Sequence, residues 1–189
     1  MIVKACNRGH SFKGVLAYVF DQGTPEEQKR YGFTHALNMS SQNRKDFAID
    51  MITTERNAEA LKQAQGIPLT GNKISKGGVY HFILSWDETE TPSPEHQKAA
   101  AIEAIGKLGL AEHQAVITNH QDTKNPHVHI VVNLTHPKTG LRASVQRDYK
   151  KLANLIISYV KNRKKLSKKI RIGYNNLDRF DFEKNLQKI

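Results

Sequence analysis

Residues 114–133 read QAVITNHQDTKNPHVHIVVN and hold three of the nine histidines of the chain. Gln114 to Asn119 and His127 to Asn133 are rich in β-branched residues, which is typical of strands. The short polar segment between them contains Asn125-Pro126, a pair that favours turns. We therefore predict two strands joined by a short loop, whose ends lie side by side if the strands pair as a hairpin.

The histidines of this segment point to a metal site. His127 and His129 are two residues apart, so both side chains face one side of a strand, while the aliphatic residues between them face the other. Hairpin pairing brings His120 beside them, and three neutral imidazoles around an open position form a catalytic site for a divalent metal ion. Asp122 is a candidate to accept a ring N–H and fix its tautomer. The alternative is an exposed hairpin face without metal, and the cluster alone does not define a reaction.

The rest of the chain alternates strand and helix patterns. Strands are expected over 2–6, 31–38 and 79–86. Helices are expected from an N-cap at Ser11, over 43–65, over 93–108 with Gly109 closing the helix, and over 147–163. A turn is expected at 137–140. This order predicts an α+β fold, a mainly antiparallel central sheet of about five strands flanked by helices. We expect one domain over 1–189, with 161–189 a basic C-terminal extension.

The charge of the chain favours a polyanionic partner. It has 29 Lys and Arg against 18 Asp and Glu, a formal net charge of +11, and nucleic acid is the usual partner of such a domain. A basic protein without that partner is the alternative. No apolar run approaches the ~20 residues of a membrane span, and the first residues lack a signal peptide. The single cysteine, Cys6, excludes an internal disulfide and favours a reducing cytoplasm.

Three motifs in order resemble the relaxases of the mobilisation-nuclease family, the MOB-P group of HUH endonucleases. Residues 11–18 read SFKGVLAY and carry a tyrosine in the first helix. Residues 81–86 read HFILSW, a strand that ends near a serine. Residues 120–129 then have the form His-x-Asp-x-x-Asn-x-His-x-His, which is the most specific of the three. The matches run from Met1 to about Ser144, most of the chain.

The resemblance implies a relaxase-type fold and a role for each motif. Tyr18 is the implied nucleophile, His120, His127 and His129 are the implied metal ligands, and Ser85 helps to position the DNA. The implied ion is Mg²⁺ or Mn²⁺, although such ligands also bind Zn²⁺ or Ni²⁺ in vitro. The implied substrate is single-stranded or hairpin DNA at an origin of transfer of a plasmid or conjugative element. Accessory proteins and a secretion coupling protein in the bacterial cytoplasm are the implied partners, and the resemblance implies transfer of the domain to the recipient cell attached to the DNA.

The chemistry is consistent with these roles. A divalent ion on neutral ligands keeps its charge and polarises a phosphodiester. Tyrosine, with a pKa near 10, needs a base or nearby positive charge to act as a nucleophile. Asp122 or a histidine without metal is the candidate base. Taken alone, Tyr18 is better interpreted as a half-buried aromatic on an amphipathic helix, and its position relative to the later motifs makes it the candidate nucleophile. The other candidate tyrosines are Tyr31, Tyr80, Tyr149, Tyr159 and Tyr174.

Basic residues form three further groups. Residues 161–171 hold seven Lys or Arg and no acid, a run that neutralises phosphates without reading sequence or simply solvates a helix end. Lys73 and Lys76 lie in a loop before the serine strand. A third group follows the histidine strand and is expected to line a DNA groove: Arg142, Arg147, Lys150 and Lys151.

Two rival functions use the same residues. A zinc-type hydrolase would use the histidines without a covalent intermediate, so Tyr18 would be dispensable. A DNA-binding module without activity would use them for a structural metal. A replication-initiating nuclease shares the chemistry, but its His-x-His usually precedes its tyrosine, whereas Tyr18 comes first here.

Overall fold

The computed structural model describes residues 1–6, 9–20, 31–69, 77–120, 123–162 and 172–174, with the backbone alone for 31, 158, 160–162 and 172–174. Six strands form one sheet: β1 (Ile2–Ala5), β2 (Tyr31–Leu37), β3 (Val79–Ser85), β4 (Ala115–His120), β5 (His127–Asn133) and β6 (Ile172–Tyr174). Five helices accompany it: α1 (Phe12–Phe20), α2 (Phe47–Arg56), α3 (Ala58–Ala64), α4 (Pro94–Lys107) and α5 (Asp148–Asn162).

The sheet has the strand order β2-β4-β5-β3-β1-β6. Its first five strands pair antiparallel, and the three-residue β6 pairs with β1 in parallel. The α+β class and the mainly antiparallel sheet of about five strands are therefore confirmed. The sixth strand was not expected, because three residues are too few to give a strand periodicity.

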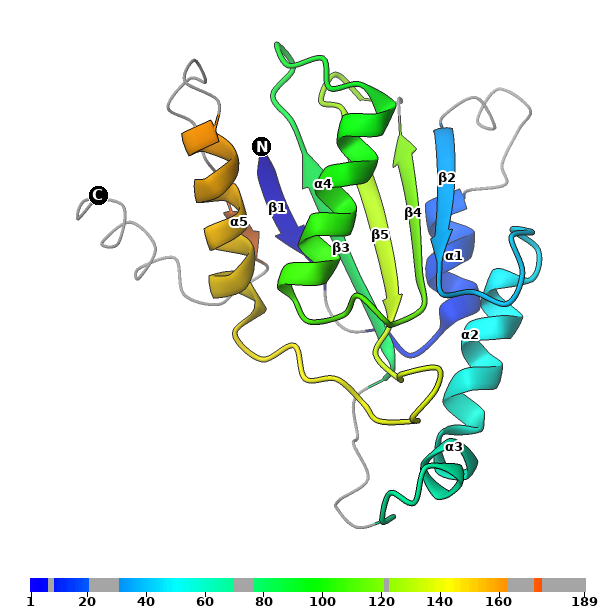
Figure 1. Cartoon of the computed structure of the whole chain (residues 1–189). Coiled ribbons are helices and arrows are strands. Elements are labelled where there is room, and N and C mark those ends of the chain that lie inside the picture. Colours follow the sequence, from blue (N-terminus) through cyan, green and yellow to red (C-terminus); the bar gives the residue numbers. More distant parts are fainter. Residues whose placement is uncertain (7–8, 21–30, 70–76, 121–122, 163–171, 175–189) are drawn as a thin grey trace.

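Helices cover both faces of the sheet (Figure 1). On one face, α4 and α5 pack against alternate residues of β3, β4 and β5, among them Val128, Ile130 and Val132. On the other face, α1 and α2 form a smaller core over Val116 and Val131. The predicted apolar face of β5 is confirmed. The histidine face is itself partly buried, because α1 and α2 cover the adjacent part of it.

The ends of the helices follow local signals. The Ser11 hydroxyl accepts a hydrogen bond from the Gly14 N–H at 3.0 Å, as expected of an N-cap. Gly109 follows α4 with a φ of 79°, the left-handed conformation that glycine adopts without strain. The single helix predicted over 43–65 is wrong. It begins only at Phe47, and Asn57 divides it into α2 and α3.

The break has a visible cause. The Asn57 side-chain amide and backbone N–H both donate to the Thr53 carbonyl, at 2.9 and 3.0 Å. Asparagine side chains compete in this way with helical hydrogen bonding. Of the helices in the described part of the chain, none is long and apolar enough to cross a membrane.

Candidate active site

The hairpin of β4 and β5 brings the three motif histidines together. His120 pairs with His127 across the two strands, and His129 lies two residues further along β5. The ring centroids of His120 and His129 are 4.2 Å apart. Each ring offers a nitrogen, and these nitrogens all lie within 4.8 Å of one another. An ion placed between the three rings would bind each nitrogen at roughly 2.0–2.1 Å, the usual distance from an imidazole nitrogen to zinc.

A hydrogen bond to each ring determines which nitrogen carries the lone pair. His120 donates from Nε2 to the Val19 carbonyl at 2.7 Å, and His127 donates from Nδ1 to the Asn125 carbonyl at 3.0 Å. A neutral imidazole has one proton, so the lone pairs are on Nδ1 of His120 and Nε2 of His127. Hydrogen bonding of the second ring nitrogen is the pattern that holds histidines as metal ligands. The donor set therefore fits a divalent ion.

Burial keeps the central rings uncharged. His129 is 3% exposed; removal from water, and then repulsion from His120, His81 and His127, lower its pKa to about 2. Removal from water and the nearby His120 likewise lower the pKa of His81 to about 4. Both rings are neutral at physiological pH, the form in which histidine binds metal.

Asn125 fixes the loop of the hairpin. Its side-chain amide donates to the Trp86 carbonyl at 2.9 Å, and the Trp86 N–H donates to the Pro126 carbonyl at 2.9 Å. These two bonds attach the loop to the chain just after β3. The Asn125 carbonyl receives the His127 ring proton, so the asparagine of the motif holds both the loop and one histidine.

Tyr18 lies on the exposed side of α1 and packs against the cluster. Its side chain is 65% exposed, and its ring meets those of His129 and His81 edge-on, with centroids 5.9 and 6.2 Å apart. Leu16 and Val19 on the opposite side of the helix lie in the smaller core. The bond from His120 to the Val19 carbonyl ties the end of α1 to the histidines. The helix is therefore docked with its tyrosine beside the candidate metal ligands.

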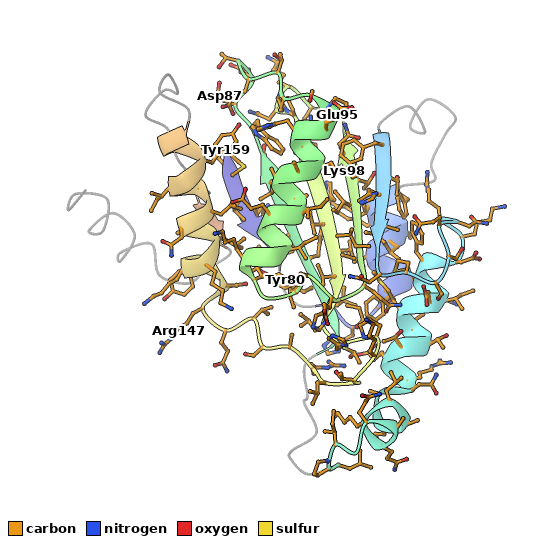
Figure 2. All side chains as sticks on the ribbon, in the orientation of Figure 1. Tyr80, Asp87, Glu95, Lys98, Arg147 and Tyr159 are labelled. Atoms are coloured by element: carbon orange, nitrogen blue, oxygen red, sulfur yellow. The ribbon has the colours of Figure 1, made fainter. Side chains whose placement is uncertain are left out.

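Two of the other tyrosines are engaged elsewhere. Tyr80 is 2% exposed, lies in the core beneath α4 and α5 and donates to Asp148 at 2.5 Å; Figure 2 labels it near the lower end of α4. Tyr159 on α5 accepts a hydrogen bond from the Trp86 ring at 2.9 Å. Tyr149 also lies on α5, while the side chains of Tyr31 and Tyr174 lie outside the described residues. Of the tyrosines whose side chains are described, Tyr18 is the one whose ring lies beside the clustered histidines.

Ser85 and Lys4 lie on the same face of the sheet as the histidines. Ser85 is the cross-strand partner of His127, and Ile83 is the partner of both His129 and Lys4, and directly opposed residues share a face. Ser85 and Ile83 are half-buried and Lys4 is exposed, whereas the residues that alternate with them are buried. The sheet surface over β3 and β1 is therefore open beside the candidate metal ligands, and it carries a cation that the sequence analysis missed.

Some of the predicted DNA-binding cations lie in the described part of the chain, and the others lie outside it. Arg142 forms an ion pair with Glu55 at 2.5 Å and lies beyond the end of β5, next to Thr135. Arg147 is exposed near the start of α5, and Figure 2 places it at the end of the molecule opposite Asp87, which follows β3. Lys150 lies one turn further on. These three lie away from the hairpin loop, and their contact with DNA stays a prediction. Other predicted residues lie outside the described part of the chain: Asp122, Lys73, Lys76 and the basic run after Asn162.

His81 is the site residue that the sequence analysis missed. Its Nε2 lies 2.9 Å from Nδ1 of His129, and the two rings stack with centroids 5.2 Å apart. Its signal was the alternation of His81, Ile83 and Ser85 along one strand, which places all three on one face. The register between β3 and β5 was needed to place that face beside His129.

Comparison with known protein families identifies the class of protein to which the chain belongs. The family model "Relaxase: MobA/VirD2-like, nuclease domain" matches residues 18–170, which include the tyrosine and all three histidines. The chain belongs to this family of relaxase nuclease domains, as the motifs predicted.

Three curated relatives, one MobA and two TraI proteins, resemble parts of the chain. MobA of Acidithiobacillus ferrooxidans is 43% identical over 65 residues, 34% of this chain and 16% of its own length. A TraI protein of Escherichia coli is 38% identical over 86 residues, 45% of this chain and 12% of its own length. Another Escherichia coli TraI is 27% identical over 126 residues, 67% of this chain and 15% of its own length. The matches therefore span only a small part of these longer relatives.

Proposed function

We propose that this domain nicks one DNA strand at a specific site in an origin of transfer and becomes covalently attached to the cut strand through Tyr18. The observation that carries the proposal is the packing of an exposed tyrosine against His129, one of three clustered histidines that can share a metal ion. The nick would start the mobilisation of a plasmid or conjugative element. The single relaxase domain over 1–189 with a basic extension from 161 belongs to the same proposal.

The covalent step transfers a phosphodiester from one oxygen to another. The Tyr18 hydroxyl oxygen bonds to the scissile phosphorus while the bond from phosphorus to the 3′ oxygen breaks. The products are a 5′-phosphotyrosyl DNA end and a free 3′-hydroxyl. The tyrosine proton leaves to a base, for which Asp122 is the proposed residue, and a proton returns to the departing 3′ oxygen. Because one phosphodiester replaces another, the reverse step reseals the strand.

His120, His127 and His129 would hold the metal ion. When bound, Mg²⁺ or Mn²⁺ supplies Lewis-acid polarisation of the phosphate and stabilises the charge of the transition state. The three ligands are neutral and therefore leave the charge of the ion undiminished. Zn²⁺ or Ni²⁺ would also bind this set of nitrogen ligands in vitro.

The open sheet surface offers a path for the DNA strand. Lys4, Ile83 and His129 occupy one row across three neighbouring strands, and strands lie about 4.8 Å apart. The Lys4 backbone is therefore about 10 Å from that of His129, close enough for its long side chain to meet a phosphate next to the scissile one. Ser85 would contact the same strand. Additional phosphate contacts are proposed for Lys73, Lys76, Arg142, Arg147 and Lys150.

Detection of a covalent adduct tests the proposal. Supercoiled DNA that carries the flanking region of the gene is incubated with the protein and Mg²⁺ or Mn²⁺, then treated with detergent and separated on a gel. We expect nicked DNA with attached protein for the wild type and none for Tyr18→Phe. Tyr149→Phe removes another exposed tyrosine hydroxyl and should retain the adduct.

The other outcomes separate the alternatives. An adduct that survives Tyr18→Phe would move the nucleophile to another tyrosine. Nicking without any adduct would favour a phosphodiester hydrolase that uses the same histidines. Binding of single-stranded DNA without nicking of its cognate site would favour a binding module with a structural metal. Accessory proteins and a secretion coupling protein are the proposed protein partners.

A further inference from the structure

His81 contacts a candidate metal ligand without being part of the ligand group. It is 6% exposed on β3, and its Nε2 lies 2.9 Å from Nδ1 of His129. The two rings are nearly parallel, with 20° between their planes. The bond is therefore well protected from water, and one of the two nitrogens must donate while the other accepts.

The direction of this bond decides whether His129 is able to bind metal. If Nδ1 of His129 donates, its lone pair is on Nε2, and that nitrogen is a ligand. If Nδ1 accepts, the proton of a neutral His129 is on Nε2, and neither nitrogen has a lone pair left for an ion. Only the first arrangement is compatible with a metal on His129.

We propose that His81 is a positioning residue that accepts the Nδ1 proton of His129 and thereby presents Nε2 of His129 to the metal. The inference rests on the proposed function, because it concerns the ion of that site. His81 keeps its own proton on Nδ1. Its role matches those of the Val19 and Asn125 carbonyls, which receive the ring protons of His120 and His127. Each of the three ligands then has one acceptor that fixes its tautomer.

A neutral acceptor suits this position. A buried carboxylate would carry a charge that is costly to remove from water, and it would offset part of the charge of the ion. The His81 ring also meets the Tyr18 ring edge-on at 6.2 Å. The same residue therefore orients a ligand and forms part of the wall beside the nucleophile.

Metal affinity measures the effect of His81 without any DNA reaction. Mn²⁺ is titrated calorimetrically into the metal-free chain for the wild type, His81→Phe and His81→Gln. Loss of a hydrogen-bond partner of a metal-bound histidine typically weakens binding 10–100-fold, and we expect a loss of this size for His81→Phe. Glutamine retains an acceptor oxygen near the position of Nε2, so His81→Gln should recover most of the affinity. A purely structural role would not produce this difference.

A matched control comes from another buried histidine. His113 is 5% exposed and is hydrogen-bonded to the Asn133 carbonyl at the other end of β5, so His113→Phe should bind Mn²⁺ as the wild type does. Thermal unfolding of each metal-free variant reports its folding separately from its affinity. Equal affinity of His81→Phe and the wild type would overturn the inference.

Nitrogen NMR of the wild-type chain loaded with Zn²⁺ avoids substitution altogether. We expect His129 to bind Zn²⁺ through Nε2 with a proton on Nδ1, and His81 to carry its proton on Nδ1. Coordination of Zn²⁺ by His81 itself, or by Nδ1 of His129, would overturn the inference.

The two proposals fail in different ways. If the covalent adduct forms but metal affinity does not depend on His81, the positioning role of His81 is wrong and the proposed function stands. His81-dependent metal binding without an adduct would support the inference and remove the covalent mechanism. A wild-type chain that binds neither Mn²⁺ nor Zn²⁺ would overturn the inference together with the proposed metal site.

Discussion

At the scale of single residues, the candidate site is organised by hydrogen bonds that hold each of its three histidine rings. Backbone carbonyls hold His120 and His127, and a neighbouring imidazole holds His129. These hydrogen bonds fix the orientation and the tautomer of each ring. Without them, either ring nitrogen would be able to carry the proton or bind the metal. The ligand positions are therefore defined before any ion binds, which reduces the ordering cost of binding.

Substitution of Asn125 tests this organisation. Asn125→Ala removes the bond to the Trp86 carbonyl but keeps the backbone carbonyl that receives the His127 proton. We expect a loss of about 1 kcal/mol in the free energy of unfolding and a lower affinity for Mn²⁺, because the loop that positions His127 loses one of the two bonds that attach it to the chain after β3. Urea unfolding and calorimetry measure the two effects.

Asn125→Asp sharpens the test. An aspartate also lacks the amide donor, and it places a negative charge against the Trp86 carbonyl. It should therefore destabilise the chain more than Asn125→Ala does. An Asn125→Ala variant as stable as the wild type, with unchanged metal affinity, would contradict the role of this side chain.

At the scale of elements, the connection into α5 contains a strained residue. Arg147 precedes the helix with a φ of 57°, a conformation that costs non-glycine residues roughly 1–2 kcal/mol. We expect Arg147→Gly to be more stable than Arg147→Ala by about 1 kcal/mol, because glycine removes the strain while alanine keeps it. Thermal unfolding of the two variants gives the comparison, and equal stabilities would mean that the left-handed conformation is not retained.

These variants also address the predicted DNA contact of Arg147. Both remove the same guanidinium group, so any contact with phosphate is lost equally in the two. A similar drop in affinity for single-stranded DNA in both variants would assign Arg147 to the DNA-binding surface. Unchanged affinity in both would leave it with a role in the turn alone.

The strands β1 and β3 lead to a prediction about the DNA path. Lys4→Ala should weaken the binding of single-stranded DNA and reduce the salt dependence, by about 0.7 in the slope of log affinity against log salt concentration for one lost phosphate contact. Lys107→Ala removes an exposed lysine from the end of α4, which packs on the opposite face of the sheet, and should have little effect. Fluorescence anisotropy at several salt concentrations measures both. Equal slopes for Lys4→Ala and the wild type would indicate that the bound DNA strand does not pass over β1.

At the scale of the whole molecule, the candidate metal site joins parts that are far apart in the chain. An ion on the hairpin of β4 and β5 would reinforce the bonds from this hairpin to α1 and β3. Ligands that bind only the folded state stabilise it, by about 2.7 kcal/mol at a concentration of 100 times the dissociation constant. We expect Mn²⁺ at that concentration to raise the melting temperature by roughly 5–10 °C.

Two controls define this prediction. Removal of the metal with a chelator should reverse the increase, and His127→Ala should lose most of it because one ligand is missing. The same increase in His127→Ala would indicate that Mn²⁺ binds elsewhere on the chain.

The whole molecule also shows why the sequence predicted some features and missed others. The hairpin and its three histidines depend on alternation within a short segment, and its geometry was predicted correctly. The bond between His81 and His129 depends on the register of β3 against β5, and the ion pair of Arg142 with Glu55 joins residues 87 positions apart. No local periodicity carries such information. The break at Asn57 was missed for another reason, because a side-chain hydrogen bond interrupted an otherwise helical pattern.

The proposed metal ligands and the proposed nucleophile are far apart in the chain. This separation affects the order in which they come together during folding. The three histidines fall within ten consecutive residues, whereas Val19, beside the proposed nucleophile Tyr18, is 101 positions from its partner His120. Long loops close more slowly and at a greater entropic cost than a hairpin does. We therefore expect a refolding chain to assemble the proposed metal ligands before it brings the proposed nucleophile beside them.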